Sequence, residues 1–546
     1  MEPKSRSLRS LLQDWAAATV NTSLPKPPPY DGPDVMLTSF VEHSDYVKPG
    51  ACFIARVRTG TDGHAYISKA VEEGASLIIG QLPAEELENE LGNTPYLQTE
   101  DSSVAEAWLA AAFYDFPSRH LVIIGVTGTD GKTTTVNLIN EILLAAGLSS
   151  GMLSTIKASF GDKEEPLALH VTTPEAPVIQ SHLRRMVNRE LTHCVLEVTS
   201  HGLSQNRVAA VDIDVAVVTN ITHEHLDYHG DYASYLEAKT RLFSTVSSKS
   251  VKDENRSSLK NSGRPAAVLN ADDESFNRLL TAAADKRIIY GFDERSEVTA
   301  GEINYHRDGL DFILTLPRHG GDGSIEISIA AALVGQFNVY NILAAAAAAH
   351  SLNLSPEIIK KGVQNLKGLT GRMERIEAGQ TFEIIVDFAH TPNALEKAIA
   401  AARVMVSGRI ITVFGSAGMR DVAKRRLLAE VSAKAAEFTI LTAEDPRTES
   451  LDTILEAMAA GCRAHGGIEG TDFWRIPDRG QAIYWALNKA TTDDLVLICG
   501  KGHEQSMCFG TTEYPWDDID VTLKMVAAYL NDLPVPDTGL PTFEPG

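Results

Sequence analysis

The sequence has few cysteines, no excess of basic residues and no long apolar run, and each absence excludes a class of protein. Its five cysteines form no C-x-x-C pair, and no cysteine or histidine partners stand at the spacing usual for zinc. Two of the cysteines lie inside apolar runs, which predicts buried free thiols in a reducing compartment.

A formal net charge of −23 argues against nucleic acid as a partner, because phosphate backbones bind basic surfaces. An acidic protein that binds a polyphosphate needs Mg²⁺ and local lysines or arginines. We find no signal peptide pattern, and the alanine-rich run 343–349 is too short to span a membrane and predicts a packed helix. The expectation is a cytoplasmic, monomeric enzyme that binds neither nucleic acid nor a membrane.

Strand-like apolar runs alternate with helical patterns along most of the 546 residues, which predicts an α/β protein of several domains. We expect a small α/β N-terminal domain over 1–118, a central parallel-sheet domain of the P-loop type over 119–366, and a C-terminal Rossmann-like domain over 367–546. The polar segment 247–264 predicts an exposed loop insertion. The proline-rich end from Leu533 predicts a loose tail.

The central domain is organised around a glycine-rich turn, Gly125–Thr134, which follows an apolar strand and precedes a helical pattern. Such a turn directs backbone N–H groups and a helix N-terminus at one point, where phosphate oxygens fit. Lys132 is expected at the outer phosphates and the Thr133 hydroxyl at Mg²⁺. Val126 replaces the first glycine of the usual spacing, and a turn without chemistry is the alternative. The residues expected at ATP are Gly128, Thr129, Asp130, Gly131, Lys132, Thr133 and Thr134.

Other polar clusters follow predicted strands of this domain and should meet the glycine-rich turn at one sheet edge. Glu197 suits a Mg²⁺ ligand, although a helix cap or a salt bridge would also explain it. His223, His225 and His229 lie close together beside Asp227, which favours a metal or phosphate role. A lone helical lysine is usually solvated, so the sequence alone does not single out Lys239.

In the C-terminal domain polar groups again follow the predicted strands, at Asp387–Pro392, Gly415–Asp421, Thr442–Arg447 and Gly500–Glu504. This pattern predicts a second ligand edge. Arg372 lies in the predicted joint between domains, where it could reach a nucleotide or form a structural salt bridge.

Taken together, these motifs resemble those of the Mur ligases, ATP-dependent ligases that build the peptide of the bacterial cell-wall precursor. Within that family the sequence is most similar to the UDP-N-acetylmuramoyl-tripeptide synthetases. The resemblance covers nearly the whole chain, and its matching stretches are Thr127–Thr133, Thr172–Pro174, Glu197–His201, His225–Gly230, Asn270–Asp273, Gly335–Asn341, Gly371–Glu374, Asp387–Pro392 and Gly500–Glu504.

The resemblance implies ligation of a free diamino acid to UDP-MurNAc-L-Ala-D-Glu through an acyl phosphate, with ATP and Mg²⁺. It implies Lys132, Glu197, His225 and Lys239 as catalytic residues, and Thr133, Glu197, His225 and a carbamate on Lys239 at the metal. It adds Asn270, Arg372 and Asp387 at ATP. It places these residues at the other substrates: Ser44, Thr59, Gly60, Thr61, Thr172, Thr173, Thr199, Gln205, Arg207, Arg420, Glu444, Asp445, Pro446, Arg447, Gly500 and Glu504.

The sequence departs from the family pattern at several of these positions. His43-Ser44-Asp45 stands where Asp-Ser-Arg is usual near the uridine, and Asp130 stands where asparagine is common. Glu444-Asp445 replaces Asp-Asn in the motif associated with meso-diaminopimelate, and Met419 stands where aspartate is frequent. We place meso-diaminopimelate slightly ahead of lysine and ornithine as the added amino acid. The alternatives are a folylpolyglutamate synthetase, another ligase of this superfamily, or a nucleotide-binding homologue without catalysis.

Overall fold

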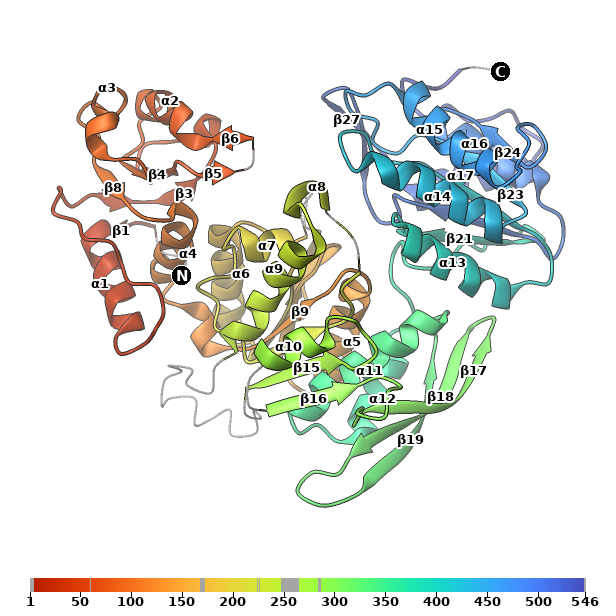
Figure 1. The fold of residues 1–546 in the computed structure, drawn as a ribbon, viewed down its shortest axis with the longest axis horizontal. Coiled ribbons are helices and arrows are strands. Elements are labelled where there is room, and N and C mark those ends of the chain that lie inside the picture. Colours follow the sequence, from red (N-terminus) through yellow and green to blue (C-terminus); the bar gives the residue numbers. More distant parts are fainter. Residues whose placement is uncertain are drawn as a thin grey trace. The chain divides into compact units, whose positions relative to one another are not determined.

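A computed structural model describes residues 4–58, 60–166, 172–222, 224, 226–246, 265–282 and 286–544, except for the side chains of residues 166, 226 and 227. The predicted loop insertion 247–264 and the site residues Thr59, His223 and His225 lie outside these residues. The chain forms two compact units. Figure 1 labels their helices and strands. The first comprises residues 1–221, 233–297 and 344–358, and the second comprises 222–232, 298–343 and 359–546.

The first unit begins with a small parallel sheet of strand order β3-β4-β7-β8. Helices α1 and α4 cover one side of it, where Trp15 and Trp108 stack with ring centroids 6.0 Å apart. This confirms the predicted α/β class for the start of the chain. Its elements are β1 (Arg6–Ser7), α1 (Leu8–Thr19), β2 (Met36–Leu37), β3 (Ser39–Val41), β4 (Ala51–Ile54), β5 (Val57–Arg58), β6 (Thr61–Asp62), α2 (Ile67–Glu72), β7 (Leu77–Gly80), α3 (Glu88–Leu91), β8 (Tyr96–Gln98) and α4 (Ser102–Phe113).

An eight-stranded sheet of order β12-β11-β10-β13-β9-β14-β15-β16 forms the rest of the first unit. Six neighbouring strands, β10, β13, β9, β14, β15 and β16, are parallel. Strands β11 and β12 add an antiparallel edge beside β10. The central strands are buried along their whole length, as continuous apolar runs predict. Its elements are β9 (Val122–Thr127), α5 (Lys132–Ala145), β10 (Ser150–Leu153), β11 (Lys157–Phe160), β12 (Glu164–Pro166), α6 (Ala176–Asn188), β13 (His193–Glu197), α7 (Ser200–Ser204), β14 (Val215–Val218), α9 (Tyr232–Thr245), β15 (Ala266–Asn270), α10 (Phe276–Ala282) and β16 (Lys286–Tyr290).

The second unit contains an antiparallel sheet, β17-β18-β19, and a six-stranded sheet of order β20-β21-β25-β22-β23-β24. The first of these sheets exposes alternate residues. The elements that precede the six-stranded sheet are α8 (Leu226–His229), β17 (Thr299–His306), β18 (Gly309–Pro317), β19 (Ser324–Ala331), α11 (Gln336–Ser351) and α12 (Pro356–Asn365). The end of α11 and the start of α12, within residues 344–358, belong to the first unit. Those that follow are β20 (Glu374–Arg375), β21 (Glu383–Asp387), α13 (Pro392–Met405), β22 (Ile410–Phe414), α14 (Val422–Ala435), β23 (Phe438–Leu441), α15 (Leu451–Ala464), β24 (Phe473–Arg475), α16 (Arg479–Lys489), β25 (Leu495–Cys499), β26 (Ser506–Phe509), β27 (Thr512–Pro515) and α17 (Asp518–Leu530).

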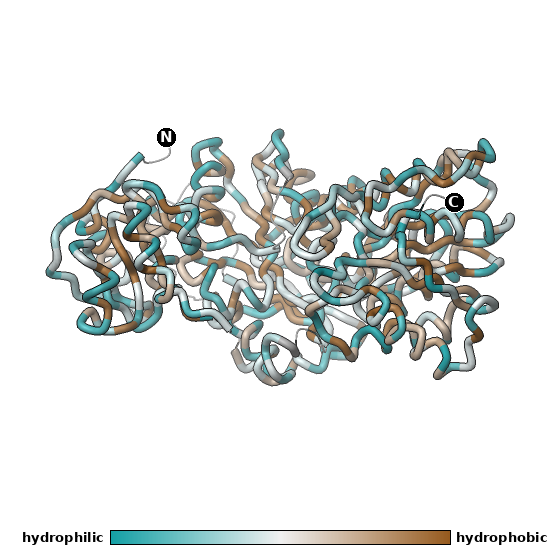
Figure 2. The backbone as a smooth tube through the Cα atoms, turned by 90° about the horizontal axis from the view of Figure 1, so that it is seen from above, coloured by the Kyte–Doolittle hydropathy of each residue, from teal (hydrophilic) through white to brown (hydrophobic). Residues whose placement is uncertain are grey.

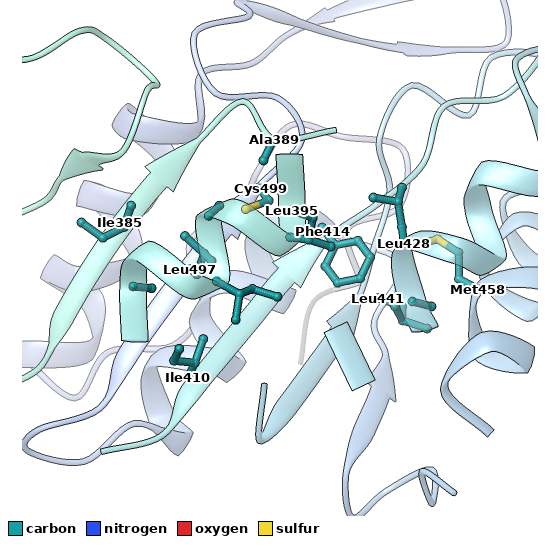
Figure 3. Packing of buried hydrophobic residues seen from close by; sticks show 14 of the residues in the cluster. Ile385, Ala389, Leu395, Ile410, Phe414, Leu428, Leu441, Met458, Leu497 and Cys499 are labelled. Atoms are coloured by element: carbon teal, nitrogen blue, oxygen red, sulfur yellow. The ribbon is translucent and has the colours of Figure 1, made fainter. Parts of the chain in front are cut away.

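Successive residues of a strand point to opposite faces of a sheet. Both faces of the six-stranded sheet carry apolar side chains, and helices cover both of them. Ile385 belongs to the apolar cluster on one face, which Figure 3 shows with Phe414 and Leu497. Its neighbours Ile384 and Val386 belong to the cluster on the other face. Apolar and hydrophilic stretches alternate along the chain accordingly, as the brown and teal segments of Figure 2 show. The predicted doubly wound, Rossmann-like arrangement is confirmed here.

Two sequence expectations about helices and the chain end have different outcomes. The alanine-rich run lies within α11 and is buried, as predicted. The prediction of a loose tail from Leu533 is wrong, since that segment packs on α16. Tyr484 donates to the Leu533 carbonyl over 2.8 Å, and Leu540 is 5% exposed. Among the described residues, no helix is both long and apolar enough to cross a membrane.

Candidate active site

The phosphate loop lies between β9 and α5, where the sequence predicts it. Gly128 has φ 152°, and a Cβ there would stand 1.9 Å from the Thr219 hydroxyl oxygen, so only glycine fits. Gly131, with φ 80°, immediately precedes α5. Asn220 closes the loop by accepting the Thr129 N–H at its carbonyl and the Asp130 N–H at its side chain, over 2.7 and 3.1 Å. The result is a compact turn at a helix N-terminus, a geometry that binds phosphate.

Two lysines converge on one carbonyl of this loop. Lys132 Nζ donates to the carbonyls of Gly128 and Thr129 over 3.0 and 2.7 Å. Lys239, from α9, is 1% exposed, donates to the same Gly128 carbonyl over 2.6 Å and lies 4.7 Å from the Tyr235 ring centre. The usual expectation of a solvated helical lysine is therefore wrong for Lys239.

The buried carboxylate at the same edge is Glu197, the last residue of β13, which is 1% exposed. Thr133 Oγ1 lies 3.0 and 3.1 Å from its two oxygens, and the backbone N–H of Thr155 donates over 3.0 Å. Among the described residues Glu197 forms no salt bridge and caps no helix, so neither alternative explanation applies. A carboxylate beside a threonine hydroxyl supplies the hard oxygen ligands that Mg²⁺ prefers.

Five of the predicted substrate residues belong to one hydrogen-bonded network that touches Glu197. The Thr155 hydroxyl lies 2.9 Å from Glu197 Oε1 and 3.1 Å from the Thr172 hydroxyl. Thr173 donates to the Glu197 carbonyl and accepts the Thr199 N–H, over 3.1 and 2.9 Å.

The network continues to an arginine. Arg207 donates to the Thr173 carbonyl over 2.6 Å and to the Gln205 side-chain oxygen over 2.7 Å. The residues predicted to bind the sugar-peptide are therefore linked to Glu197, the predicted Mg²⁺ ligand, through Thr155 and Thr173.

The N-terminal segment reaches this network through a residue that the sequence did not single out. Arg56 is 6% exposed and donates to the Gln205 carbonyl over 2.9 Å and to Glu175 over 3.0 Å. It also pairs with Glu42 and, over 3.4 Å, with Glu106. Burial and the Glu42 charge raise the pKa of Glu106 well above its usual range. Three carboxylates around Arg56 thus fix it beside the predicted sugar-peptide residues.

The remaining predicted residues of the first unit are less closely connected. Ser44 is buried in a 3-10 turn, whereas Gly60 and Thr61 are exposed in the β5–β6 hairpin. Within the described residues, no hydrogen bond joins these three to the threonine network. Asn270 is 5% exposed and donates to the Thr219 carbonyl over 2.7 Å, so it braces the end of β14.

A second polar edge lies at the carboxyl ends of β23 and β25 in the second unit. Glu444 is 8% exposed, and burial raises its pKa. Its Oε2 atom is buried without a hydrogen bond. Gly500 has φ 112°, a backbone conformation that favours glycine, and a Cβ there would lie 2.3 Å from that oxygen.

Charged groups flank Glu444 on the same loop. Asp445 accepts from Lys501 Nζ and from the Cys508 N–H, each over 3.0 Å. Lys501, which is 2% exposed, also lies 2.5 Å from Glu504. Arg447 has φ 53°, and within the described residues its guanidinium forms no hydrogen bond or ion pair. The loop therefore presents an unpaired cation beside a buried carboxylate.

Arg372, Asp387 and Arg420 also lie in the second unit. Asp387 accepts the backbone N–H groups of Met373 and Ala389, over 2.7 and 2.8 Å. The Arg372 guanidinium lies 4.4 Å from the centre of the Phe388 ring. Arg420 is exposed in the loop before α14. The predicted ATP-binding residues are thus divided between the two units.

The Mur ligase middle domain matches residues 126–349, and the glutamate ligase domain of Mur ligases matches residues 371–502. A UDP-N-acetylmuramyl-tripeptide synthetase of Roseiflexus sp. is 41% identical over 88% of this chain and 93% of its own length. The chain belongs to the Mur ligase family. Members of this family are ATP-dependent ligases that form ADP.

Two further comparisons support the assignment to the Mur ligases. A UDP-N-acetylmuramoyl-L-alanyl-D-glutamate–2,6-diaminopimelate ligase of Geobacillus kaustophilus is 39% identical over 86% of this Mur ligase and 91% of its own length. A solved structure of a ligase with the same name has 27% identity and a TM-score of 0.57, covering 90% of this chain and 95% of its own. The predicted family, fold class and ligase activity are confirmed.

Several residues of the site were not predicted, and their signals differ. Thr155 follows an apolar strand, as the other strand-end residues do, so the same rule would have found it. Lys501 lies inside the predicted Gly500–Glu504 motif. Arg56 and Glu175 carry no local signal, because their importance depends on contacts between distant segments.

Proposed function

We propose that this Mur ligase joins a diamino acid to a carboxylate of UDP-MurNAc-L-Ala-D-Glu, using ATP and Mg²⁺. The names of its relatives supply the substrates, and the hydrogen bond between Thr133 and Glu197 at the phosphate loop is the observation that carries the chemistry. A carboxylate is a poor electrophile and must be activated before an amine can attack it. Transfer of the γ-phosphoryl group of ATP to the carboxylate oxygen releases ADP and gives an acyl phosphate.

The protein's part in this first step is to position charges. The N–H groups of the loop and Lys132 would hold the transferred phosphoryl group and balance its charge. Thr133, Glu197, His225 and a carbamate on Lys239 would hold Mg²⁺, which neutralises phosphate charge. The buried Lys239 amine at the Gly128 carbonyl fits that role, because its position is already beside the loop.

In the second step the neutral amine of the incoming amino acid attacks the acyl carbon, and inorganic phosphate leaves. Water must be excluded, because it would hydrolyse the acyl phosphate. Glu444 is the residue that we propose to bind the incoming amino acid. Its buried oxygen without a hydrogen bond is a site for an ammonium group, which every diamino acid offers.

For the amino acid we propose meso-diaminopimelate, because Arg447 is available to bind its distal carboxylate. The Asp445 carboxylate would cancel that role if it paired with Arg447, but Asp445 is paired with Lys501 instead. A guanidinium binds a carboxylate through two parallel N–H donors.

Lysine and ornithine are the second candidate. Three carboxylates, those of Glu444, Asp445 and Glu504, face two cations, Lys501 and Arg447, on these loops. The surplus negative charge favours a bare ammonium over a side-chain carboxylate.

The test measures ADP and phosphate release with ATP, Mg²⁺ and UDP-MurNAc-L-Ala-D-Glu, for each of the three diamino acids and for alanine. We expect sustained release of ADP and phosphate only when both the UDP-sugar peptide and a diamino acid are present, with the highest kcat/KM for meso-diaminopimelate. AMP and pyrophosphate as products would contradict the mechanism. Turnover with a folate and glutamate instead would favour a folylpolyglutamate synthetase.

Arg447→Ala provides the control for the choice among diamino acids. We expect it to lower kcat/KM for meso-diaminopimelate far more than for ornithine. If ornithine is preferred by the wild type and the order is unchanged in Arg447→Ala, the diaminopimelate proposal is wrong.

The division into domains 1–118, 119–366 and 367–546 is also proposed, because each range contains its own mainly parallel sheet. Cytoplasmic location, a monomeric state and the absence of nucleic-acid or membrane partners stay predictions from the sequence. So does the binding of uridine nucleotide near Ser44, Thr59, Gly60 and Thr61.

A further inference from the structure

A completely buried ion pair lies beneath the second polar edge. Arg479 is the first residue of α16 and Asp518 the first of α17, and both side chains are 0% exposed. Arg479 Nε lies 2.7 Å from Asp518 Oδ1, and its terminal nitrogen lies 2.7 Å from Oδ2. This is the paired geometry in which an arginine and a carboxylate interact most strongly.

The remaining donors of Arg479 bind the strands that lead into both amino-acid loops. One terminal nitrogen donates to the Cys499 carbonyl over 2.8 Å, directly before Gly500. The other lies 3.5 Å from the Ala443 carbonyl, directly before Glu444. A single guanidinium therefore connects the ends of β23 and β25.

Asp518 completes the connection from the other side. Its Oδ2 atom accepts the Gly502 N–H over 3.2 Å, inside the Gly500–Glu504 loop. Its Oδ1 atom accepts the Trp516 indole N–H over 2.8 Å. The carboxylate thus holds the second loop at Gly502, whereas Arg479 holds the strand end at Cys499.

The loop at residues 444–447 needs such support because its backbone is strained. Asp445 and Arg447 have φ of 41° and 53°. Residues other than glycine adopt this left-handed conformation only where surrounding contacts hold them.

The pair also bears on the charge of Glu444. Burial raises the pKa of Glu444, and the charges of Lys424 and then Arg479 oppose that rise. Arg479 thus favours the ionised form of the carboxylate that would receive the substrate ammonium.

We propose that Arg479 and Asp518 are positioning residues for the amino-acid site: they fix loops 444–447 and 500–504 relative to each other so that Glu444, Arg447 and Glu504 converge on one ligand. The proposal rests on the proposed function in one respect, namely that these loops bind the incoming amino acid. A buried ion pair is weak evidence for stability, since apolar residues of similar size often replace it without loss of folding. That property makes the two roles separable.

The main variant is Arg479→Met/Asp518→Leu, which removes both charges and leaves no unpaired one. Steady-state kinetics of the full-length enzyme would be measured for each of the three substrates, together with the melting temperature. We expect KM for the amino acid to rise on the order of a hundredfold, because small displacements of binding groups are costly. KM for ATP and for the UDP-sugar peptide should change less than about twofold.

Two further measurements keep the proposal testable if the double variant folds poorly. Arg479→Lys keeps a cation beside Asp518 but removes the guanidinium that donates to the Cys499 and Ala443 carbonyls, and we expect the same selective rise in KM. Hydroxylamine trapping of the acyl phosphate without amino acid should be unchanged in both variants, since that step does not use these loops.

The matched control is Arg409→Met, which breaks an ion pair at the opposite end of the same sheet. Arg409 lies 2.6 Å from Asp494, beside the first residues of β22 and β25. We expect this variant to leave KM for the amino acid unchanged.

The outcomes are distinct. A folded double variant with normal KM for the amino acid would overturn the proposal, and so would equal losses in trapping and in amino-acid binding. If the wild type forms the acyl phosphate but accepts none of the amino acids, the proposed function fails before any variant is made.

Discussion

At the edge of the eight-stranded sheet, Glu197 is held by threonine side chains and by a backbone N–H, and the two nearby lysines donate to backbone carbonyls. At the edge of the six-stranded sheet, by contrast, Asp445 is held by a buried lysine. The Arg479–Asp518 ion pair supports both loops there. At the first edge the charged groups therefore contact neutral hydroxyls, a backbone N–H and backbone carbonyls, whereas at the second edge charged groups contact each other.

The difference follows from what each edge would bind. Phosphate is the same in every ATP, and a glycine-rich turn with a helix N-terminus suits it. An amino acid must be distinguished from similar ones, which requires charges at fixed separations. Variants at the first edge should therefore affect catalysis as a whole, and variants at the second should affect the choice and affinity of one substrate.

The largest effect is expected for Lys132→Ala. Loss of this ammonium leaves the transferred phosphoryl charge unbalanced, so we expect kcat to fall on the order of a thousandfold. The fold should be retained, because within the described part of the chain Lys132 donates to two loop carbonyls and to no other group. The measurements are phosphate release and the melting temperature. A variant that unfolds, or one with a near-normal rate, would show that the role of Lys132 is structural.

Lys239→Ala should be next, with ligation severely impaired and partly restored by short carboxylic acids. A carboxylate could occupy the space of the buried side chain and replace the proposed carbamate as a Mg²⁺ ligand. The readout is the ligation rate against acid concentration. Lys132→Ala is the control, because a carboxylate cannot replace its missing ammonium. Full activity of Lys239→Ala without added acid would refute the carbamate assignment.

Much of the first edge was predictable from the sequence, and these two lysines show the limit. Lys132 follows the glycines of a recognisable turn, and Glu197 ends an apolar strand. Lys239 lies on an ordinary helical pattern, and only the fold brings it to the Gly128 carbonyl. Its proposed role rests on the family resemblance, because helical periodicity says nothing about which distant carbonyl a side chain meets.

The second edge was predictable only in outline. The polar residues that follow the predicted strands indicated the loops at Glu444 and Gly500. Arg479 and Asp518 stand at helix starts 39 positions apart in the chain, where an arginine and an aspartate would ordinarily be solvent-exposed. Their burial depends on the packing of α16 and α17 on the sheet, which no local pattern encodes.

A moderate and selective effect is expected for Lys501→Met. This change removes the partner of Asp445, whose carboxylate would then attract Arg447. We expect the preference for meso-diaminopimelate over ornithine, as a ratio of kcat/KM, to fall by about tenfold.

The control for Lys501→Met is Asp445→Asn, in which Arg447 has no new partner, so the preference should persist. If Lys501→Met leaves the ratio unchanged, Lys501 does not keep Arg447 available.

The smallest effect concerns the chain end that packs on α16. Asp478 precedes α16, is 0% exposed and accepts the Gln481 N–H at Oδ1 over 2.9 Å, which caps the helix. Its other oxygen accepts from Thr538 over 2.8 Å and from Thr542 over 3.1 Å. A Cβ at Gly480 would lie 2.3 Å from the Thr538 methyl group, so the two segments are in close contact.

Thr538→Val removes one of these hydrogen bonds while keeping the methyl contact. We expect a loss of about 1 kcal/mol of stability, seen as a fall of about 2–4 °C in the melting temperature of the unit that contains α16. KM for the amino acid should rise only slightly, because Arg479 keeps its own partners. Ser450→Ala, which removes the cap of α15, is the control: it should cost similar stability without any change in KM. A large rise in KM for Thr538→Val would instead show that the chain end sets the position of Arg479.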